Sequence, residues 1–147
     1  MAPNLGPKAS EIRFRLCEPD HLIIIKVHLN DTGPYDFILD TGASLTVVSP
    51  AAARAAGIGE GGIRAKALGA NERQNVRIVR LKSLRAGSVE TRNISVGVMS
   101  LATLSRALRL RLGGILGYNV LRRYQLTIDY RRRRIWFDGH VSPAMPQ

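Results

Sequence analysis

The chain has 147 residues, of which 45% are hydrophobic, and its formal net charge at pH 7 is +11. This length and composition predict one soluble globular domain that is large enough to bury a normal core. Apolar runs such as Leu22 to Ile25 are far too short to span a bilayer, and a single cysteine, Cys17, excludes an internal disulfide and a cysteine metal cluster.

The 22 lysines and arginines are twice as many as the 11 acidic residues. Such an excess suits an anionic partner, either nucleic acid or a membrane surface. It equally suits a requirement for solubility combined with a bias toward arginine codons, because most of the cations are dispersed. The one block, Arg131 to Arg134, is expected to be a solvated hairpin tip, with a nucleic-acid contact as the alternative.

The N-terminal part of the chain predicts a flexible leader followed by strands. Residues 1–11 contain little that could pack into a core, and we expect them to be the leader. In residues 12–16 apolar and charged side chains alternate with a period of two, and residues 22–29 are rich in β-branched side chains, so both segments predict strands. A dense turn signal over residues 30–34 predicts a hairpin that returns as a strand over residues 35–40.

An unusual segment follows, in which an apolar strand ends in Asp40-Thr41-Gly42-Ala43-Ser44 and then becomes apolar again. Buried strands avoid aspartate unless it is paired or functional. Gly42 allows a tight turn, and the hydroxyls of Thr41 and Ser44 can bind a carboxylate or the backbone. The segment predicts a strand that presents one carboxylate in a hydrogen-bonded loop, and an aspartate that caps the next turn is the alternative.

The rest of the chain predicts strands interrupted by short helices. Ser49, Pro50 and Gly57 delimit a first helix. Leucines that recur every three or four residues predict a second helix over residues 100–112, which Gly113 and Gly114 would end. Strands are expected over residues 63–68, 75–81, 89–99, 115–117, 125–130 and 135–138, with a third short helix over residues 118–123.

The segment Asp40-Thr41-Gly42-Ala43-Ser44 resembles the active-site loop of aspartic peptidases, especially the single-domain, retropepsin-like branch. The segment Gly-Ile-Leu-Gly-Tyr-Asn-Val-Leu at residues 114–121 resembles the second hydrophobic-hydrophobic-glycine motif of that family. The resemblance covers residues 12–138, with residues 139–147 as a C-terminal tail. It implies a mostly β, closed barrel-like domain with one or two short helices.

The resemblance also assigns roles to particular residues. It implies a catalytic Asp40, with Thr41, Gly42, Ala43 and Ser44 supporting the loop. In the family a strand that ends in glycine passes behind this loop, and here Ile115, Leu116 and Gly117 match it. A mobile hairpin, the flap, folds over the substrate in the family. Its tip is matched loosely by Leu68, Gly69 and Ala70, and an ordinary hairpin is the alternative.

Aspartic peptidase chemistry needs two carboxylates, and we find no internal repeat strong enough to supply a second Asp-Thr-Gly. The resemblance therefore implies an endopeptidase that is active as a homodimer, with an Asp40 from each copy, a polypeptide substrate and no cofactor. His21, His28 and His140 lack the spacing of metal ligands. Two alternatives remain open: a catalytically inactive, dimeric peptide-binding module of the same fold, and a basic nucleic-acid-binding domain.

The first residues lack both the basic segment and the apolar segment of a signal peptide. No membrane segment is expected in this chain, and a cytoplasmic location is favoured for the chain as given.

Overall fold

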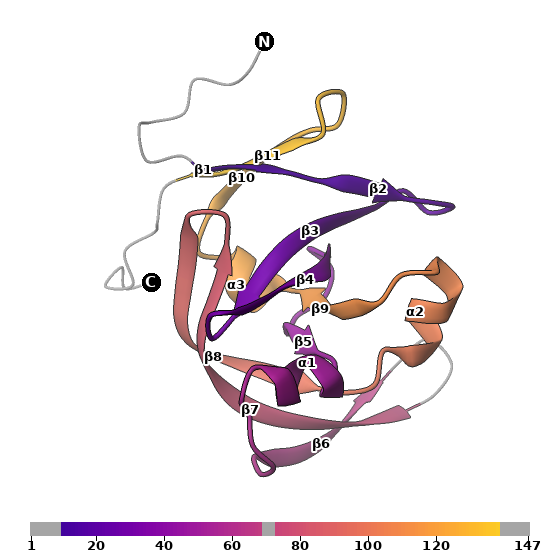
Figure 1. Cartoon of the computed structure of the whole chain (residues 1–147), viewed down its shortest axis with the longest axis vertical. Coiled ribbons are helices and arrows are strands. Elements are labelled where there is room, and N and C mark those ends of the chain that lie inside the picture. The colour runs from indigo at the N-terminus through magenta and orange to yellow at the C-terminus, as the bar shows by residue number, and fades with distance from the viewer. Residues whose placement is uncertain (1–9, 69–72, 139–147) are drawn as a thin grey trace.

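The computed structural model describes residues 10–68 and 73–138. These residues form a mostly β structure in which three short helices interrupt a succession of strands (Figure 1). In chain order the elements are β1 (Ser10–Arg13), β2 (Arg15–Cys17), β3 (Leu22–Leu29), β4 (Thr32–Leu39), β5 (Val47–Val48), α1 (Pro50–Ala55), β6 (Ile63–Leu68), β7 (Arg73–Ala86), β8 (Val89–Val98), α2 (Ala102–Leu108), β9 (Leu112–Leu116), α3 (Tyr118–Leu121), β10 (Gln125–Asp129) and β11 (Arg134–Asp138). None of these helices is long and apolar enough to cross a membrane.

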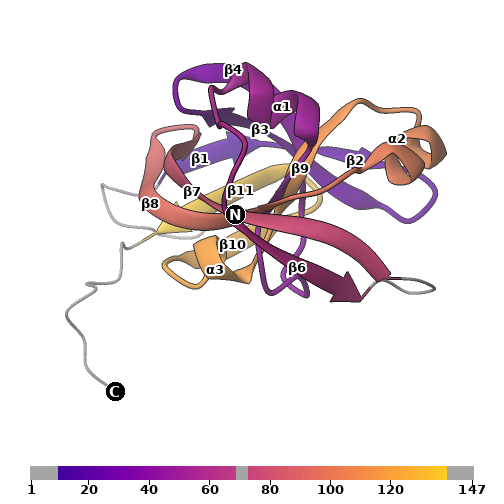
Figure 2. The same ribbon diagram turned by 90° about the horizontal axis from the view of Figure 1, so that it is seen from below.

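The strands form two sheets, seen from two directions in Figures 1 and 2. The small sheet has the order β1-β11-β10, and the large sheet has the order β2-β3-β4-β9-β5-β8-β7-β6. A further pairing joins β3 to β7, so that β3, β4, β9, β5, β8 and β7 form a closed ring. The mostly β fold predicted from the sequence is thus confirmed, and the ring gives it a barrel-like centre.

Several local predictions are confirmed. The strand β3 covers residues 22–29 as expected, and a turn with left-handed backbone at Asn30 and Asp31 connects it to β4. The helix α1 begins at Pro50, where the Oγ atom of Ser49 accepts a hydrogen bond from the Ala52 N–H at 3.1 Å. The strands predicted over residues 63–68, 75–81, 89–99 and 115–117 are also present, most of them with different ends. The single strand predicted over residues 12–16 is wrong, because the chain breaks at Phe14 into β1 and β2, which belong to different sheets, and β1 begins at Ser10, inside the predicted leader.

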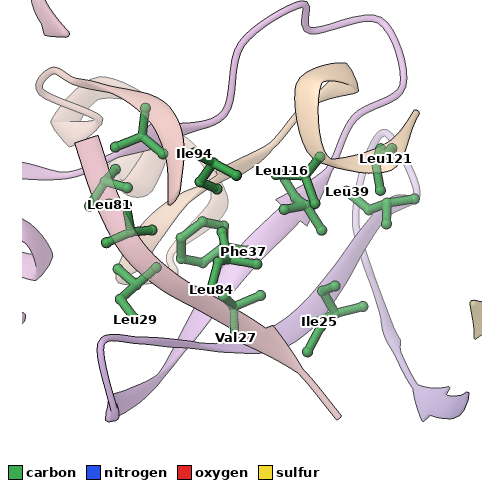
Figure 3. Close-up of a cluster of buried hydrophobic side chains, with 14 of the residues drawn as sticks. Ile25, Val27, Leu29, Phe37, Leu39, Leu81, Leu84, Ile94, Leu116 and Leu121 are labelled. Carbon is green, nitrogen blue, oxygen red and sulfur yellow. The ribbon is translucent and has the colours of Figure 1, made fainter. Parts of the chain in front are cut away.

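The main hydrophobic core takes side chains from both sheets. Phe37 on β4 has no exposed surface and lies among side chains from β3, β7 and β8 (Figure 3). Ile12 and Ile135 on β1 and β11 join the same cluster, so the core holds the small sheet against the large one. Each fully buried side chain of this size stabilises the fold by about 1.5–3 kcal/mol.

The prediction for residues 100–112 is wrong at its C-terminal end. The helix α2 ends at Leu108, Arg109 adopts a left-handed conformation, and Leu112 already belongs to β9. The regular spacing of the leucines has another cause. Leu101, Leu104 and Leu108 from the α2 segment and Leu112 from β9 all pack into a second hydrophobic cluster against β3 and β4. The periodicity therefore reflected one buried cluster that two elements share.

Gly113 and Gly114 do not end a helix but lie inside β9, where neighbouring side chains leave no space for a Cβ atom. A Cβ on Gly114 would overlap the carbonyl oxygen of Val47 and lie 2.5 Å from the Phe37 ring. A Cβ on Gly113 would lie 2.5 Å from the Tyr35 Cβ atom. The two glycines therefore permit β9 to insert closely between β4 and β5.

We predict that Gly114→Ala lowers the free energy of unfolding by about 1–3 kcal/mol, because the added methyl group overpacks the core. The matched control is Gly59→Ala, since a Cβ at Gly59 meets no atom within 4 Å. The control should change stability by less than about 0.5 kcal/mol. Urea unfolding curves of both variants test this, and equal stabilities would contradict the close packing described for β9.

The hairpin of β7 and β8 contains a carboxylate with a perturbed pKa. The hydroxyl of Ser83 donates a hydrogen bond to Glu90 at 2.6 Å, and Arg92 lies 3.4 Å from the same oxygen. The hydrogen bond from Ser83 is the largest cause that lowers the pKa of Glu90 below its ordinary value of 4.5. Desolvation opposes it, and the charges of Arg92 and Arg85 each add a smaller lowering. Because the pKa is lower in the folded state, ionised Glu90 favours folding above pH 4.5, and this contribution is lost as the pH falls through the folded-state pKa.

We predict that Ser83→Ala raises the pKa of Glu90 toward its ordinary value, because the largest cause of the shift is removed. A carboxyl-detected NMR titration of the two proteins measures this directly. Thr103→Ala, on α2, should leave the Glu90 titration unchanged. An identical Glu90 titration in Ser83→Ala would show that the hydroxyl is not the cause.

Candidate active site

The candidate site lies where the chain crosses from β4 to β5 over the end of β9. The strand β9 lies between them, parallel to β4 and antiparallel to β5. Residues 40–46 connect β4 to β5, so they must pass over the C-terminal end of β9. The Asp40 N–H donates to the Leu116 carbonyl at 3.0 Å, and the Tyr118 N–H donates to the Ala43 carbonyl at 2.6 Å. Hydrogen bonds on both sides therefore hold the loop to β9 and α3.

Within the loop, Asp40 directly follows the buried end of β4 and is itself exposed. The Gly42 N–H donates to Asp40 Oδ1 at 2.9 Å, and the Ala43 N–H donates to the Asp40 carbonyl at 3.2 Å. Among the described residues, the hydroxyls of Thr41 and Ser44 make no side-chain hydrogen bond. Within residues 10–68 and 73–138, the Asp40 carboxylate is therefore held by the Gly42 N–H and not by a loop hydroxyl.

Asp40 also differs electrostatically from three of the other five aspartates of this basic chain. Asp31, Asp36 and Asp129 each lie within 4.0 Å of an arginine or lysine nitrogen. Asp40 has no such cation within 4.0 Å among residues 10–68 and 73–138. Its carboxylate is thus held by one backbone N–H and is otherwise available to a ligand.

The segment of Ile115, Leu116 and Gly117 lies directly behind the loop. Ile115 and Leu116 pair with Ile38 and Leu39 at the end of β4. A Cβ atom on Gly117 would lie 2.8 Å from the Leu45 carbonyl group and 2.9 Å from the Ala43 oxygen. Only glycine leaves enough space for the Asp40 loop at this distance from the end of β9.

The sequence analysis missed a buried polar network beneath the loop. Thr46 is fully buried, and its hydroxyl accepts from the Gly117 N–H at 3.0 Å and donates to Asn119 Oδ1 at 2.8 Å. The Thr46 N–H donates to the same Asn119 oxygen at 2.8 Å, and the Asn119 Nδ2 group donates to the Ser95 carbonyl at 2.8 Å. The signals that could have revealed it are a threonine within the apolar strand that follows the loop and an asparagine two residues after Gly117.

The expectation of a single Asp-Thr-Gly is wrong, because the tripeptide occurs a second time at residues 31–33, within the segment predicted to be a turn. Asp31 lies in the turn before β4, with a φ of 64°, and Arg85 lies 3.6 Å from its carboxylate. Because the eight residues of β4 separate Asp31 from Asp40, the two carboxylates are about 30 Å apart. One chain therefore cannot bring them together.

The hairpin that we compared to a flap is present as β6 and β7, paired from Ile63 opposite Ile78 to Leu68 opposite Arg73. Leu68 is the last residue of β6. The predicted tip residues Gly69 and Ala70 lie outside the described residues. The flap therefore stays a prediction.

Residues 25–120 match a family model described as aspartyl protease. The chain belongs to the aspartyl protease family. The match includes the loop at Asp40, Gly117 and the Asn119 network, so it covers every part of the candidate site described above.

Solved structures place this aspartyl protease family member in the retropepsin-like fold. A retropepsin-like aspartic protease from Rickettsia conorii is 21% identical, with a TM-score of 0.65 over 92% of this chain and 96% of that one. The retroviral protease-like domain of Ddi1 from Leishmania major is 16% identical, with a TM-score of 0.58 over 85% of this chain and 94% of that one. No curated protein matches the chain.

We predict that Thr46→Val lowers the free energy of unfolding by about 1–3 kcal/mol, because it leaves the buried Gly117 N–H without its acceptor at nearly unchanged side-chain volume. Thr127→Val on β10 is the control, since this hydroxyl makes no side-chain hydrogen bond within the described part of the chain. Chemical unfolding of both variants tests the prediction. Equal stability of the two variants would show that the network contributes little.

Proposed function

We propose that the chain is an aspartic endopeptidase that hydrolyses peptide bonds as a homodimer. One observation carries the proposal: Asp40 presents an exposed carboxylate, free of cations, on a loop that backbone hydrogen bonds and the Thr46–Asn119 network hold in place. Membership of the aspartyl protease family supports that role.

The proposal needs two copies of the chain because each provides one suitable carboxylate. The second Asp-Thr-Gly segment begins about 30 Å away along β4 and carries an ion-paired aspartate. Asp40, Thr41 and Gly42 are all exposed in the single chain, so the loop is accessible to a second copy. Related by a two-fold axis, two such loops would place one Asp40 beside the other.

The proposed chemistry follows from the proximity of two carboxyl groups. At about 3 Å the two groups cannot both ionise, so they share one proton, as aspartic protease dyads generally do. The protonated Asp40 polarises the carbonyl of the scissile peptide, and the ionised Asp40 of the other copy accepts a proton from the attacking water. A tetrahedral diol forms and breaks down to two peptides, without a covalent bond to the enzyme.

The remaining loop residues take supporting roles in this proposal. The Gly42 N–H keeps the Asp40 carboxylate oriented. The Thr41 and Ser44 hydroxyls, which have no side-chain partner within one chain, are available to the second copy or to the carboxylates, and Ala43 borders the site. The segment that ends in Gly117 supports the loop from behind, and the tip of the β6–β7 hairpin would cover an extended polypeptide bound between the two copies.

We predict that Asp40→Asn abolishes cleavage of a mixed peptide library, with a loss of at least roughly 10²–10⁴-fold, because an amide cannot transfer the protons. The wild type should show a bell-shaped pH profile, since the carboxyl pair titrates as a unit. Mass spectrometry of the products between about pH 4 and pH 7 measures both. The matched control is Asp31→Asn, which alters the second Asp-Thr-Gly segment at a left-handed position that asparagine tolerates.

The control variant should cleave like the wild type. Equal cleavage by the wild type and by Asp40→Asn would contradict the proposal. If neither cleaves, although both are dimeric and bind library peptides, the chain is instead a peptide-binding module of the same fold.

Adding excess Asp40→Asn to a fixed amount of wild type should lower the wild-type activity, because mixed dimers hold only one Asp40. Unchanged activity after subunit exchange would rule out the shared site.

A further inference from the structure

A basic surface with an exposed aromatic ring lies at the end of the small sheet, away from any residue used in the proposed catalysis. It consists of Arg13 at the end of β1 and Tyr130, Arg131, Arg132 and Arg133 in the turn between β10 and β11, and we call it the hairpin patch. All five residues are exposed. Figure 1 shows the turn between β10 and β11 projecting from the body of the molecule.

The strand register brings these cations together. Arg13 pairs with Arg134, the first residue of β11, so it lies directly beside the turn. The Phe14 N–H donates to the Arg133 carbonyl at 3.1 Å, which ties β1 to the same turn. Four arginine side chains therefore gather at one end of a three-stranded sheet, although they come from opposite ends of the sequence.

Acidic residues neutralise little of this charge. Arg13, Arg131 and Arg133 have no carboxylate within 4.0 Å among the described residues, and Arg132 has only Asp129, at 3.9 Å. The Arg133 guanidinium donates to the Tyr130 carbonyl at 3.2 Å, which leaves its charge uncompensated. The terminal segments 1–9 and 139–147 contain no acidic side chain that could cover the patch.

Tyr130 adds an aromatic surface to the patch. The residue is 56% exposed, so its ring is accessible to a ligand. The edge-to-face contact with the buried Phe14, at 6.0 Å between ring centroids, holds the ring in place. A fixed, accessible ring among arginines is the arrangement on which an unpaired nucleic-acid base stacks while the phosphates bind the guanidinium groups.

We propose that the hairpin patch binds single-stranded nucleic acid. The four arginines would contact successive phosphates, and Tyr130 would stack on one base. An acidic polypeptide or an anionic membrane surface would also satisfy the charges, and a nucleic-acid base would in addition stack on the face of the Tyr130 ring. The proposal does not depend on the peptidase activity, because none of these residues belongs to the Asp40 loop or its supports.

The test measures the fluorescence anisotropy of a labelled 20-nucleotide oligouridine with the full chain at several salt concentrations. Arg13→Gln combined with Arg131→Gln should weaken binding and lower the slope of log K against log salt concentration by about 1.4, since each lost phosphate contact contributes about 0.7. The matched control combines Arg54→Gln on α1 with Arg106→Gln on α2, which removes the same charge from exposed residues elsewhere. The control should leave the slope nearly unchanged.

Two variants of Tyr130 separate stacking from charge. Tyr130→Leu should weaken binding by at least about fivefold, because the base loses its aromatic partner, whereas Tyr130→Phe should bind like the wild type. Circular dichroism confirms that each variant is folded. Equal weakening by the patch and control pairs would overturn the proposal, as would unchanged binding by Tyr130→Leu. The proposal would also be overturned if polyglutamate, or vesicles containing phosphatidylserine, displaced the labelled oligouridine as well as unlabelled oligouridine of equal charge does.

Discussion

The structure depends above all on one steric constraint, the insertion of β9 between β4 and β5. Because β9 occupies the position between these strands, the segment that follows β4 must arch over its end, and this arch is the loop that presents Asp40. The close approach is possible only because Gly114 and Gly117 lack side chains where Val47, Leu45 and Ala43 come nearest. The geometry of the candidate site is therefore a consequence of how the centre of the sheet packs.

Polar groups beneath the loop complete what the packing begins. A loop that crosses a strand end leaves backbone groups without strand partners, and buried groups of this kind are costly. Thr46 and Asn119 satisfy the Thr46 and Gly117 N–H groups and extend the connection to the Ser95 carbonyl on β8. The exposed Asp40 thus rests on a rigid base while its own carboxylate remains accessible, an arrangement suited to a group that must meet a ligand in a defined orientation.

Much of the fold could be predicted from local patterns. β-Branched runs and turn signals indicated β3 and the hairpin into β4, and the Ser49 cap indicated the start of α1. The helix over residues 100–112 was predicted too long because periodicity reports which side chains are buried together and not which element carries them. The contact between Thr46 and Asn119 was not predicted, because the two residues are 73 positions apart in sequence and neither polar residue by itself indicates its partner.

The sequence by itself determined the family, through two short motifs. One contains Asp40 on its turn, and the other contains Gly117, where the structure leaves no space for a side chain. The sequence already pointed to Asp40, through the apolar residues 37–39 before it and the second motif at residues 114–121. Only the tertiary structure showed that the two Asp-Thr-Gly segments differ in the surroundings of their carboxylates. Asp31 follows β3 into a simple hairpin turn and pairs with Arg85, whereas Asp40 follows β4 onto a loop that β9 and α3 hold. The two carboxylates differ because of long-range contacts. Identical tripeptides have the same local preferences, so the strands packed around each tripeptide determine whether its carboxylate is neutralised or left available.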